Sequence, residues 1–296
     1  MQQLKNIEVL QNVPLDTYSF SQIGGIADYL ALPKNETEFI TLLKTAKQNS
    51  ISVTVLGQMS NVILSDDGVS GLIIVTEKMK EININNNQMT FGAGLDMITA
   101  SEYAMRNSLS GLEWAAGLPG SVGGAVFMNA GAYGGNTSDN LVKIRALDEF
   151  GTLFELTKKD LGFTYRMSEI QRNNLLVTQA TFELSPRDQN EVKAEMDDFN
   201  QRRIAKQPLE FPSNGSVFKR PNGFYSGKLI QDAGLQGKRI GGAQISNKHA
   251  NFIVNIDNAK AADYLELINL VQTTIKNLHG IDMELEVKLI GRGLNQ

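Results

Sequence analysis

Residues 112–135 read LEWAAGLPGSVGGAVFMNAGAYGG, and the rest of the chain is interpreted around this stretch. It holds seven glycines, at positions 117, 120, 123, 124, 131, 134 and 135. Because glycine costs a helix interior up to about 1 kcal/mol relative to alanine, the stretch is typical of neither a helix nor a strand. Apolar side chains such as Trp114 and Val126 are interleaved with the glycines, unlike in a flexible linker. The stretch indicates either a tight buried loop or, our preferred interpretation, a walled cleft whose bare main chain approaches a large, planar, phosphate-bearing ligand.

The common nucleotide-binding fingerprints do not match this chain. The glycine spacing at 117, 120, 123 and 124 is not GxGxxG, and FGAG at 91–94 lacks a third glycine. No GxxxxGK[ST] occurs. A two-domain Rossmann dehydrogenase and a P-loop enzyme are both disfavoured.

Composition sets the broad class. The chain has 296 residues, 42% of them hydrophobic, enough to bury two or three modest cores. A net charge of -4 gives no general attraction to nucleic acid or anionic membranes. No cysteine is present, which excludes disulfides and thiolate chemistry, and we expect no metal site. Neither a signal peptide nor a membrane-spanning run is visible, so we expect a cytoplasmic monomer.

The N-terminal part predicts a βαβ unit. Residues 35–49 have helical apolar spacing after the possible cap Asn35, and apolar runs flank them at 29–32 and 51–56. The second run ends in Gly57, Gln58, Met59, Ser60 and Asn61, a turn of small polar groups where a pyrophosphate commonly sits. Taken alone, this turn is more simply interpreted as an ordinary surface turn.

The remaining chain alternates strands and helices, with a change of character at residues 185–207, which are charged and mostly helical. We take that segment as the bridge to a second domain. The expected elements are strands within 72–94, a helix at 96–107, a hairpin around Gly151, a long strand at 175–184, a helix at 227–233, β structure at 243–256, a helix at 261–278 closed by Gly280, and a final strand at 283–290.

Three polar residues lie in stretches whose neighbours look buried: Arg166 in FTYRMS, Ser216 in PSNGSVFKRP and Glu286 in MELEVKLIG. Each also has a simpler explanation, as a salt-bridging arginine, a cap serine and a solvent-facing strand carboxylate. No GxSxG elbow or HExxH pattern supports a hydrolase. The only histidines, His249 and His279, follow residue 190, so a flavin in the first domain would be bound noncovalently.

Together the motifs resemble, over nearly the whole chain, the UDP-N-acetylenolpyruvoylglucosamine reductase family of peptidoglycan precursor synthesis. The motifs are GGIADYLALP, LGQMSN, GLPGSVGGAVFMNAGAYGG, FTYRMS, KQPLEFPSNGSVFKRP, GKLIQDAGLQGKRIGGAQISNKHANFIVN and ELEVKLIG. The resemblance implies an α+β fold, with a two-lobed FAD-binding domain of the vanillyl-alcohol-oxidase type at 1–190 (lobes about 1–70 and 71–190) and an α/β substrate-binding domain at 191–296. No tyrosine lies between Arg166 and Ser216, as in the shorter form of the family.

The resemblance also implies a reaction. NADPH reduces FAD, and flavin N5 passes hydride to the vinyl C3 of UDP-N-acetylglucosamine enolpyruvate, giving UDP-N-acetylmuramate. Arg166 and Glu286 match the residues that stabilise the resulting enolate, the glutamate as a hydrogen-bonding carboxylic acid. Ser216 matches the proton donor to C2. A serine hydroxyl can serve if nearby cations or dipoles stabilise the alkoxide.

Further site residues follow from motif position. FAD contacts are expected from the turn after the βαβ unit and from the glycine-rich stretch, and phosphate and substrate contacts from basic and aromatic residues near Arg166 and Ser216. The cofactor set is Gly57, Gln58, Ser60, Asn61, Pro119, Gly120, Ser121, Gly123, Gly124, Asn129 and Gly131. The substrate set is Tyr165, Arg202, Lys206, Lys219, Arg220 and His249.

Three residues depart from the family pattern. Met59 stands where a small residue is usual, Arg220 replaces a common asparagine, and Gln236 replaces a common lysine. Two other functions stay open at this point. One is an FAD-dependent oxidase of the same superfamily acting on an alcohol or hydroxy acid. The other is an inert FAD- or UDP-sugar-binding protein, in which Met59 has closed the pyrophosphate site.

Overall fold

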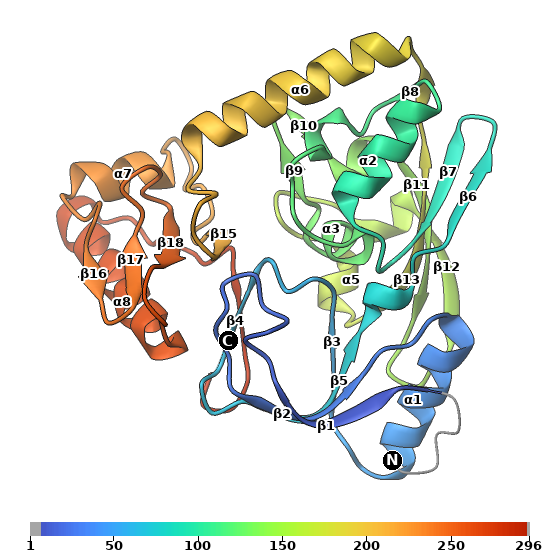
Figure 1. The fold of residues 1–296 in the computed structure, drawn as a ribbon, viewed down its shortest axis with the longest axis horizontal. Coiled ribbons are helices and arrows are strands. Elements are labelled where there is room, and N and C mark those ends of the chain that lie inside the picture. Colours follow the sequence, from blue (N-terminus) through green and yellow to red (C-terminus); the bar gives the residue numbers. More distant parts are fainter. Residues whose placement is uncertain (1–6, 295–296) are drawn as a thin grey trace. The chain divides into compact units, whose positions relative to one another are not determined.

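The structure is a computed structural model that describes residues 7–294 (Figure 1). The expectation that the chain has no signal peptide rests partly on residues 1–6. These residues lie outside the described part of the chain. Contacts divide the chain into two compact units. Unit 1 comprises residues 1–11, 29–58 and 71–203, and unit 2 comprises 12–28, 59–70 and 204–296. Compactness does not say which ligand each part binds, so the functional division after residue 190 stays a prediction.

The predicted βαβ unit is present in the first sheet. The helix α1 (Glu36–Gln48) begins at Asn35, whose side chain accepts a hydrogen bond from the Glu38 N–H, as an N-cap asparagine does. Its apolar stripe packs on Leu72 and Ile74. The sheet order is β1-β2-β5-β3, and β3 and β5 are parallel. The strands are β1 (Val9–Pro14), β2 (Ile26–Ala31), β3 (Val53–Leu56) and β5 (Val69–Val75).

A second, five-stranded sheet lies in unit 1 with the order β12-β11-β13-β7-β6, and its pairs are antiparallel. The predicted helix at 96–107 is α2 (Met97–Arg106), which packs with this sheet in one core. The hairpin predicted around Gly151 joins β11 and β12, and Gly151 has a φ of 79°, which favours glycine. The strands are β6 (Ile82–Asn85), β7 (Gln88–Gly92), β11 (Leu141–Leu147), β12 (Leu153–Thr157) and β13 (Leu176–Glu183).

The glycine-rich stretch contains a helix, which corrects the expectation that it would be neither helix nor strand. The helix α3 (Val122–Met128) starts at Ser121, whose Oγ accepts from the Gly124 N–H, and ends at Asn129 with a φ of 41°. Val122, Ala125 and Val126 are buried in the core of unit 1. Burial of this short apolar face outweighs the poor helix propensity of the two glycines, as tertiary packing often does.

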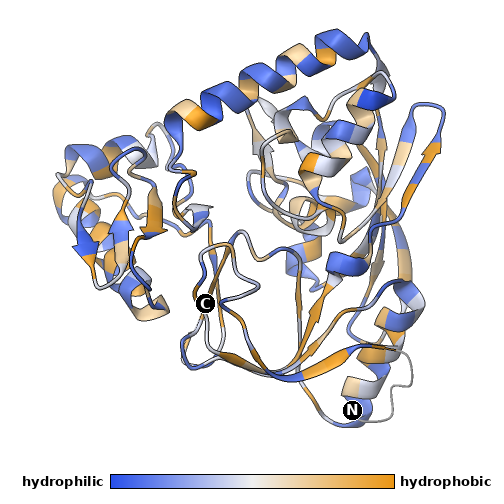
Figure 2. Ribbon diagram, viewed as in Figure 1, coloured by the Kyte–Doolittle hydropathy of each residue, from blue (hydrophilic) through white to orange (hydrophobic). Residues whose placement is uncertain are grey.

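The segment predicted to lead into a second domain is α6 (Gln189–Lys206), and Figure 2 shows it as hydrophilic along most of its length. Its buried residues are Val192, Met196 and Arg203. The shorter elements between residues 62 and 186 are β4 (Val62–Leu64), η1 (Thr76–Lys78), β8 (Leu109–Ser110), η2 (Glu113–Ala115), β9 (Gly131–Ala132), β10 (Gly135–Asn136), α4 (Thr137–Asn140), η3 (Lys158–Leu161), α5 (Glu169–Arg172) and β14 (Ser185–Pro186).

Unit 2 holds a four-stranded antiparallel sheet of order β15-β18-β17-β16, packed in one core with α7 and α8. The β structure expected at 243–256 is divided between two strands joined by a loop. The elements are β15 (Ser213–Ser216), α7 (Ser226–Asp232), β16 (Arg239–Ile240), β17 (Ala243–Ile245), β18 (Phe252–Asn255) and α8 (Ala261–His279), which Gly280 ends in a left-handed conformation.

The final strand is shorter than predicted. Only β19 (Lys288–Ile290) forms a strand, paired in parallel with β4, and the alternation expected over 283–290 does not describe residues 283–287. These residues run beside the chain after β15, where Leu285 forms an isolated bridge with Phe218. Among residues 7–294, no helix is both long and apolar enough to cross a membrane.

Candidate active site

Arg166 lies in a two-residue turn. The main chains of Thr164 and Met167 exchange two hydrogen bonds, of 3.0 and 3.2 Å, and enclose Tyr165 and Arg166. Arg166 has a φ of 56°, a left-handed conformation that costs a non-glycine residue energy and often marks a functional position. The turn holds the arginine in one place at the end of the loop.

The guanidinium of Arg166 is held at the end of α3. Its Nη1 and Nη2 donate to the carbonyls of Asn129 and Gly131, at 3.3 and 3.0 Å. The Asn129 side chain donates to the carbonyl of Thr164 at 3.0 Å and accepts from the Ser138 N–H at 3.1 Å. Asn129 and Gly131 were predicted to contact FAD. In this structure they orient Arg166, through a left-handed residue that ends the glycine-rich helix.

The loop before α3 is tied to the start of α2. Gln58 accepts from the Gly120 N–H at 2.9 Å and donates to Asp96 at 2.7 Å, and Asp96 caps α2 through the Thr99 N–H. The carbonyl of Gly120 accepts from the Met97 N–H at 2.9 Å. Of the predicted FAD residues, Gln58 and Gly120 thus fix the loop itself, and the Gly120 N–H is not an unpaired donor.

Several glycines are required by close packing of the chain on itself. A Cβ at Gly57 would lie 2.1 Å from Ser121 Oγ, and one at Gly123 would lie 2.9 Å from the Ala93 Cβ. Gly124 differs, because only Ser121 Oγ comes within 4 Å of its Cβ position, at 3.3 Å, and the residue is exposed. The loop interpretation therefore accounts for some of the glycines, and Gly124 is open to a ligand.

Arg203, on α6, lies close to Gly117 of the glycine-rich stretch and was not named in the sequence analysis. It is 5% exposed, whereas the predicted Arg202 is exposed and pairs with Asp198. Its guanidinium carbon lies 5.6 Å from the ring centroid of Tyr133, which stacks on Phe199 at 4.8 Å, and burial lowers its pKa. Helical spacing could have found it, because Val192, Met196, Phe199 and Arg203 share one face of α6.

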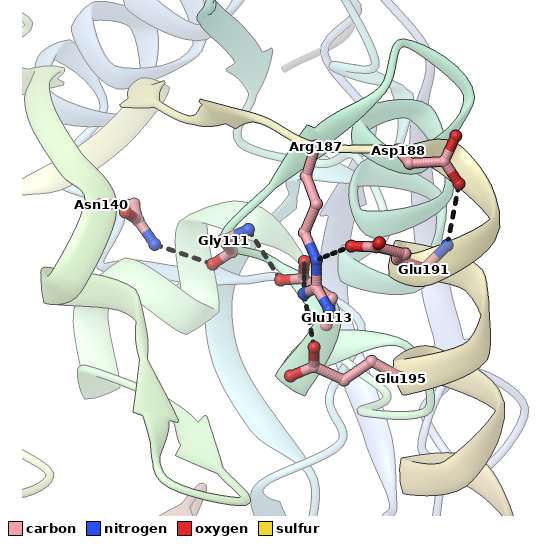
Figure 3. A network of polar contacts seen from close by, with 7 residues as sticks. All are labelled: Gly111, Glu113, Asn140, Arg187, Asp188, Glu191 and Glu195. Atoms are coloured by element: carbon pink, nitrogen blue, oxygen red, sulfur yellow. Dashed lines mark hydrogen bonds and ion pairs between the residues drawn. The ribbon is translucent and has the colours of Figure 1, made fainter.

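A buried carboxylate near the start of the glycine-rich stretch is linked to residues at the start of α6 (Figure 3). Glu113 accepts from the Gly111 N–H at 2.7 Å and lies 3.7 Å from Arg187. Arg187 also pairs with Glu195 and Glu191, at 2.6 and 3.3 Å, and these hydrogen bonds raise its pKa. The cluster anchors the chain that leads into residues 112–135.

Ser216 is the last residue of β15 and is half-buried. Gly215 before it has a φ of 71°, and the pairing of β15 with β18 shifts register between Ser213 and Ser216. Such irregularities re-aim side chains in sheets and are common near active sites. The Ser216 side chain makes no hydrogen bond to residues 7–294, so its hydroxyl can point to a ligand.

Glu286 is held next to Ser216 through the main chain of Val217. The Glu286 N–H donates to the Val217 carbonyl at 2.8 Å, and the Glu286 carbonyl accepts from the Asn61 side chain at 3.1 Å. Asn61, predicted to contact FAD, therefore positions Glu286 in this structure. Two of the predicted catalytic residues lie on adjacent main-chain segments of unit 2.

Two lysines border the same segments. Lys219 donates its N–H to the Glu284 carbonyl at 2.8 Å and pairs with the Glu284 carboxylate at 3.3 Å. Burial, together with the charge of Lys219, lowers the pKa of Lys288. Lys288 is a second cation that the sequence analysis did not name, because strand alternation gave no reason to single it out.

The other predicted substrate residues differ in their surroundings. The guanidinium of Arg220 lies 4.3 Å from the ring centroid of the exposed Tyr225. His249 is half-buried, its Nδ1 accepts from the Asn251 N–H at 3.3 Å, and burial lowers its pKa. Lys206 is exposed at the end of α6, and Tyr165 is 54% exposed.

The departures from the family pattern have structural correlates. Met59 is buried with a φ of 54°, a conformation in which glycine carries no steric cost. Gln236 donates to the Asn247 carbonyl at 2.7 Å and so holds the loop before His249. Ser60 is half-buried after Met59, and Pro119 is exposed before Gly120.

The residues of unit 1 fit a bound FAD. Residues 117–131 contain no carboxylate, and the neighbouring Asp96 is already engaged by Gln58 and the start of α2. A diphosphate would therefore meet no unpaired acid from this stretch. The exposed main chain at Gly124 leaves room for a flat ring. No histidine or cysteine lies before residue 190, so the binding would be noncovalent.

Comparisons with known families agree with this assignment. Residues 27–157 match the family described as FAD binding domain. Residues 207–290 match the C-terminal domain of UDP-N-acetylenolpyruvoylglucosamine reductase. Cholesterol oxidase from Brevibacterium sterolicum shares the fold with a TM-score of 0.50 and 18% identity over 62% of this chain and 38% of its own. The predicted α+β fold with an FAD-binding domain of this type is confirmed, and the chain is a flavoprotein with an FAD-binding domain.

Full-length relatives narrow the class. UDP-N-acetylenolpyruvoylglucosamine reductase from Limosilactobacillus reuteri is 49% identical and covers 99% of this chain and 98% of its own. The enzyme of the same name from Levilactobacillus brevis is 51% identical, covering 96% and 94%. The crystal structure of the reductase from Thermus caldophilus has a TM-score of 0.82 and 31% identity, covering 96% and 99%. The chain belongs to the UDP-N-acetylenolpyruvoylglucosamine reductase family, as its motifs predicted.

Proposed function

We propose that this protein reduces UDP-N-acetylglucosamine enolpyruvate to UDP-N-acetylmuramate with NADPH, in peptidoglycan precursor synthesis. Family membership over the full length supports the substrate. The observation that carries the proposal is the hydrogen bond from the Glu286 N–H to the Val217 carbonyl, at 2.8 Å. It joins the main-chain segments that carry Ser216 and Glu286, which supports a joint role of their hydroxyl and carboxyl groups in adding a proton to an enolate.

Bound FAD would supply the redox chemistry, the relay of hydride between NADPH and the vinyl C3 of the substrate. The side chains of the protein then stabilise the developing negative charge and donate the proton. Ser216 donates the proton to C2, and water restores the proton to its oxygen. A hydroxyl with no partner among residues 7–294 is free to rotate toward that carbon.

Arg166 stabilises the negative charge that develops on the substrate carboxylate. Its side chain is fixed by two carbonyls and a strained turn, so little reorganisation is needed when charge appears. Glu286 acts as a hydrogen-bonding carboxylic acid toward the enolate. Lys219, Arg220 and His249 in unit 2 and Tyr165 and Arg202 in unit 1 are the residues that we assign to the UDP-sugar and NADPH, together with Lys206.

Gly57, Gln58, Ser60, Asn61, Pro119, Gly120, Ser121, Gly123, Gly124, Asn129 and Gly131 are the residues that we assign to the FAD site. Gly124 contributes exposed main chain, whereas Gln58, Asn61 and Asn129 act by fixing neighbouring groups. We further propose a cytoplasmic monomer that binds no nucleic acid, consistent with its acidic net charge of -4.

The test is the visible spectrum of the purified protein under anaerobic conditions. We expect a yellow protein that loses its flavin absorbance with NADPH and regains it on addition of the enolpyruvyl UDP-sugar. Rapid recovery in air with no need for that sugar would instead support an oxidase. A colourless protein that FAD cannot reconstitute would support an inert binding protein and contradict the proposal.

A further inference from the structure

The side chain of Asn251 forms two hydrogen bonds to the main chain near Ser216, the proposed proton donor. Its Oδ1 accepts from the Phe218 N–H at 3.1 Å, and its Nδ2 donates to the Phe218 carbonyl at 2.9 Å. One carboxamide thus satisfies both polar groups of one residue, as a neighbouring strand would in a ladder. Asn251 is 7% exposed, so these bonds are shielded from water.

These two hydrogen bonds lie where the regular pairing of β15 with β18 ends. The pairing of β15 with β18 shifts register between Ser213 and Ser216 and stops at Ser216. Beyond that point Val217 still donates its N–H to the Asn251 carbonyl, at 2.8 Å. Asn251 therefore contacts two successive residues, first with its main chain and then with its side chain, and it continues the strand pairing past the irregularity.

The opposite edge of the same segment receives Glu286. The Val217 carbonyl accepts from the Glu286 N–H at 2.8 Å, and Phe218 forms the isolated bridge with Leu285. Residues 217–218 are thus held on one edge by Asn251 and on the other by the segment that carries Glu286. The position of Ser216 relative to Glu286 depends on both edges.

We propose that Asn251 is a positioning residue for proton transfer: its carboxamide fixes residues 217–218 and thereby aligns the Ser216 hydroxyl with the substrate carbon. The inference rests on the proposed role of Ser216. A misplacement of a reacting group by about 1 Å can lower a reaction rate roughly 100-fold. Loss of the Asn251 hydrogen bonds therefore slows the proton-transfer step without removing the Ser216 hydroxyl. Asn251 itself contacts no reacting atom.

The chain offers a matched control in β18, the strand that directly follows Asn251. Asn255 is 8% exposed, its Nδ2 donates to the Ser21 carbonyl at 2.9 Å, and its Oδ1 accepts from the Ala259 N–H at 2.9 Å. It therefore has nearly the same burial and the same two kinds of hydrogen bond as Asn251, but it does not touch residues 216–218. Truncation of either asparagine leaves two buried main-chain groups unpaired, so both variants lose stability.

The experiment measures two rates by stopped flow on the FAD-loaded protein: flavin reduction by NADPH, and flavin reoxidation by the enolpyruvyl UDP-sugar. We expect Asn251→Ala to leave the first rate unchanged and to slow the second by roughly 100-fold. Asn255→Ala should lower the melting temperature similarly and change neither rate. Equal slowing in both variants would show a general structural effect and overturn the proposal.

A double variant tests whether Asn251 acts through Ser216. If it does, Asn251→Ala added to Ser216→Ala slows reoxidation no further, because residues that act as a unit are not additive. A full multiplicative loss would overturn the proposal. Normal reoxidation in Ser216→Ala would contradict the proposed function itself, whereas slow reoxidation there and normal reoxidation in Asn251→Ala would overturn this inference alone.

Asn251→Asp covers the case in which the alanine variant does not fold. The aspartate has nearly the same size and still accepts from the Phe218 N–H, but as an ionised carboxylate it cannot donate to the Phe218 carbonyl. We expect a smaller selective slowing of reoxidation than for alanine. An aspartate variant with wild-type reoxidation would overturn the proposal.

Discussion

Arg166 and Ser216 are held in different ways. Arg166 sits in a turn closed by Thr164 and Met167, and its contacts with Asn129 and Gly131 lie within 37 residues in sequence. Ser216 belongs to a segment whose main chain, rather than its own side chain, is held by Asn251 and by the N–H of Glu286. Its own side chain is unpaired among the described residues.

The difference shows how each residue can work. In the proposed mechanism Arg166 presents a charge in a fixed place, so strain and two hydrogen bonds on its own guanidinium are useful. In the same mechanism Ser216 delivers a proton, and hydrogen bonds on its own oxygen would compete with the substrate. Its position is therefore set by its neighbours, and its hydroxyl stays available.

The largest effect is expected from Arg166. Arg166→Gly keeps a residue suited to the left-handed conformation but removes the charge, so flavin reoxidation by substrate should fall roughly 1000-fold, as for loss of a group that stabilises an oxyanion. Arg166→Lys should lie between glycine and wild type. Stopped-flow reoxidation measures the loss. An unchanged rate of flavin reoxidation in the glycine variant would contradict the claim that Arg166 is held in place in order to present its charge.

Alanine substitutions at two neighbouring glycines of α3 separate a glycine required for packing from a glycine that is open to the cofactor. Gly123→Ala brings a Cβ to 2.9 Å from the Ala93 Cβ, so it should destabilise the protein by about 1–3 kcal/mol. Gly124→Ala meets only Ser121 Oγ, and alanine's helix propensity should offset that contact by up to about 1 kcal/mol.

Thermal unfolding of the FAD-free protein separates the two variants, and FAD titration then tests the site. We expect Gly124→Ala to weaken FAD binding with no loss of stability. Wild-type FAD affinity in this variant would mean that the cofactor does not approach the main chain there.

The cluster around Arg187 should give a smaller effect, confined to stability. Glu113→Ala removes a buried carboxylate and leaves the partly buried Gly111 N–H without its acceptor, which should cost about 1–3 kcal/mol in urea unfolding. Glu191→Ala removes an exposed partner of the same arginine and should cost within about 0.5 kcal/mol. Equal losses would show that the buried hydrogen bond is not what anchors this segment.

His249 should give the smallest effect, a dependence of stability on pH. Burial lowers the pKa of His249 below its ordinary value of 6.5, so the unfolded chain binds the proton more readily. The stabilisation is complete above pH 6.5 and is lost as the pH falls from 6.5 toward the folded pKa. His249→Asn retains an acceptor for the Asn251 N–H, and melting curves at successive pH values should show less acid destabilisation than in wild type.

The sequence predicted the elements with strong local patterns. Asn35 marked the start of α1, and Gly280 the end of α8. It was less successful where distant contacts decide the structure. Alternation predicted a strand over residues 283–290, but only 288–290 form one, and residues 283–287 instead follow the chain around Phe218. The glycine-rich stretch forms a helix because its apolar face is buried.

The same limit applies to the candidate site. Arg166, Ser216 and Glu286 could be selected because their sequence contexts are distinctive. Asn251 could not, because its partner Phe218 lies 33 residues away and a buried asparagine looks like any other in the sequence. Arg203 was accessible through the spacing of Val192, Met196 and Phe199 on α6, since an arginine on a buried helix face is unusual.

The central claim is that Ser216 gives the proton that completes reduction. The most direct test is Ser216→Ala, loaded with FAD and followed anaerobically by flavin absorbance. The account predicts bleaching by NADPH at the wild-type rate and recovery with the enolpyruvyl UDP-sugar slowed by roughly 100- to 10,000-fold. Recovery at the wild-type rate would contradict it.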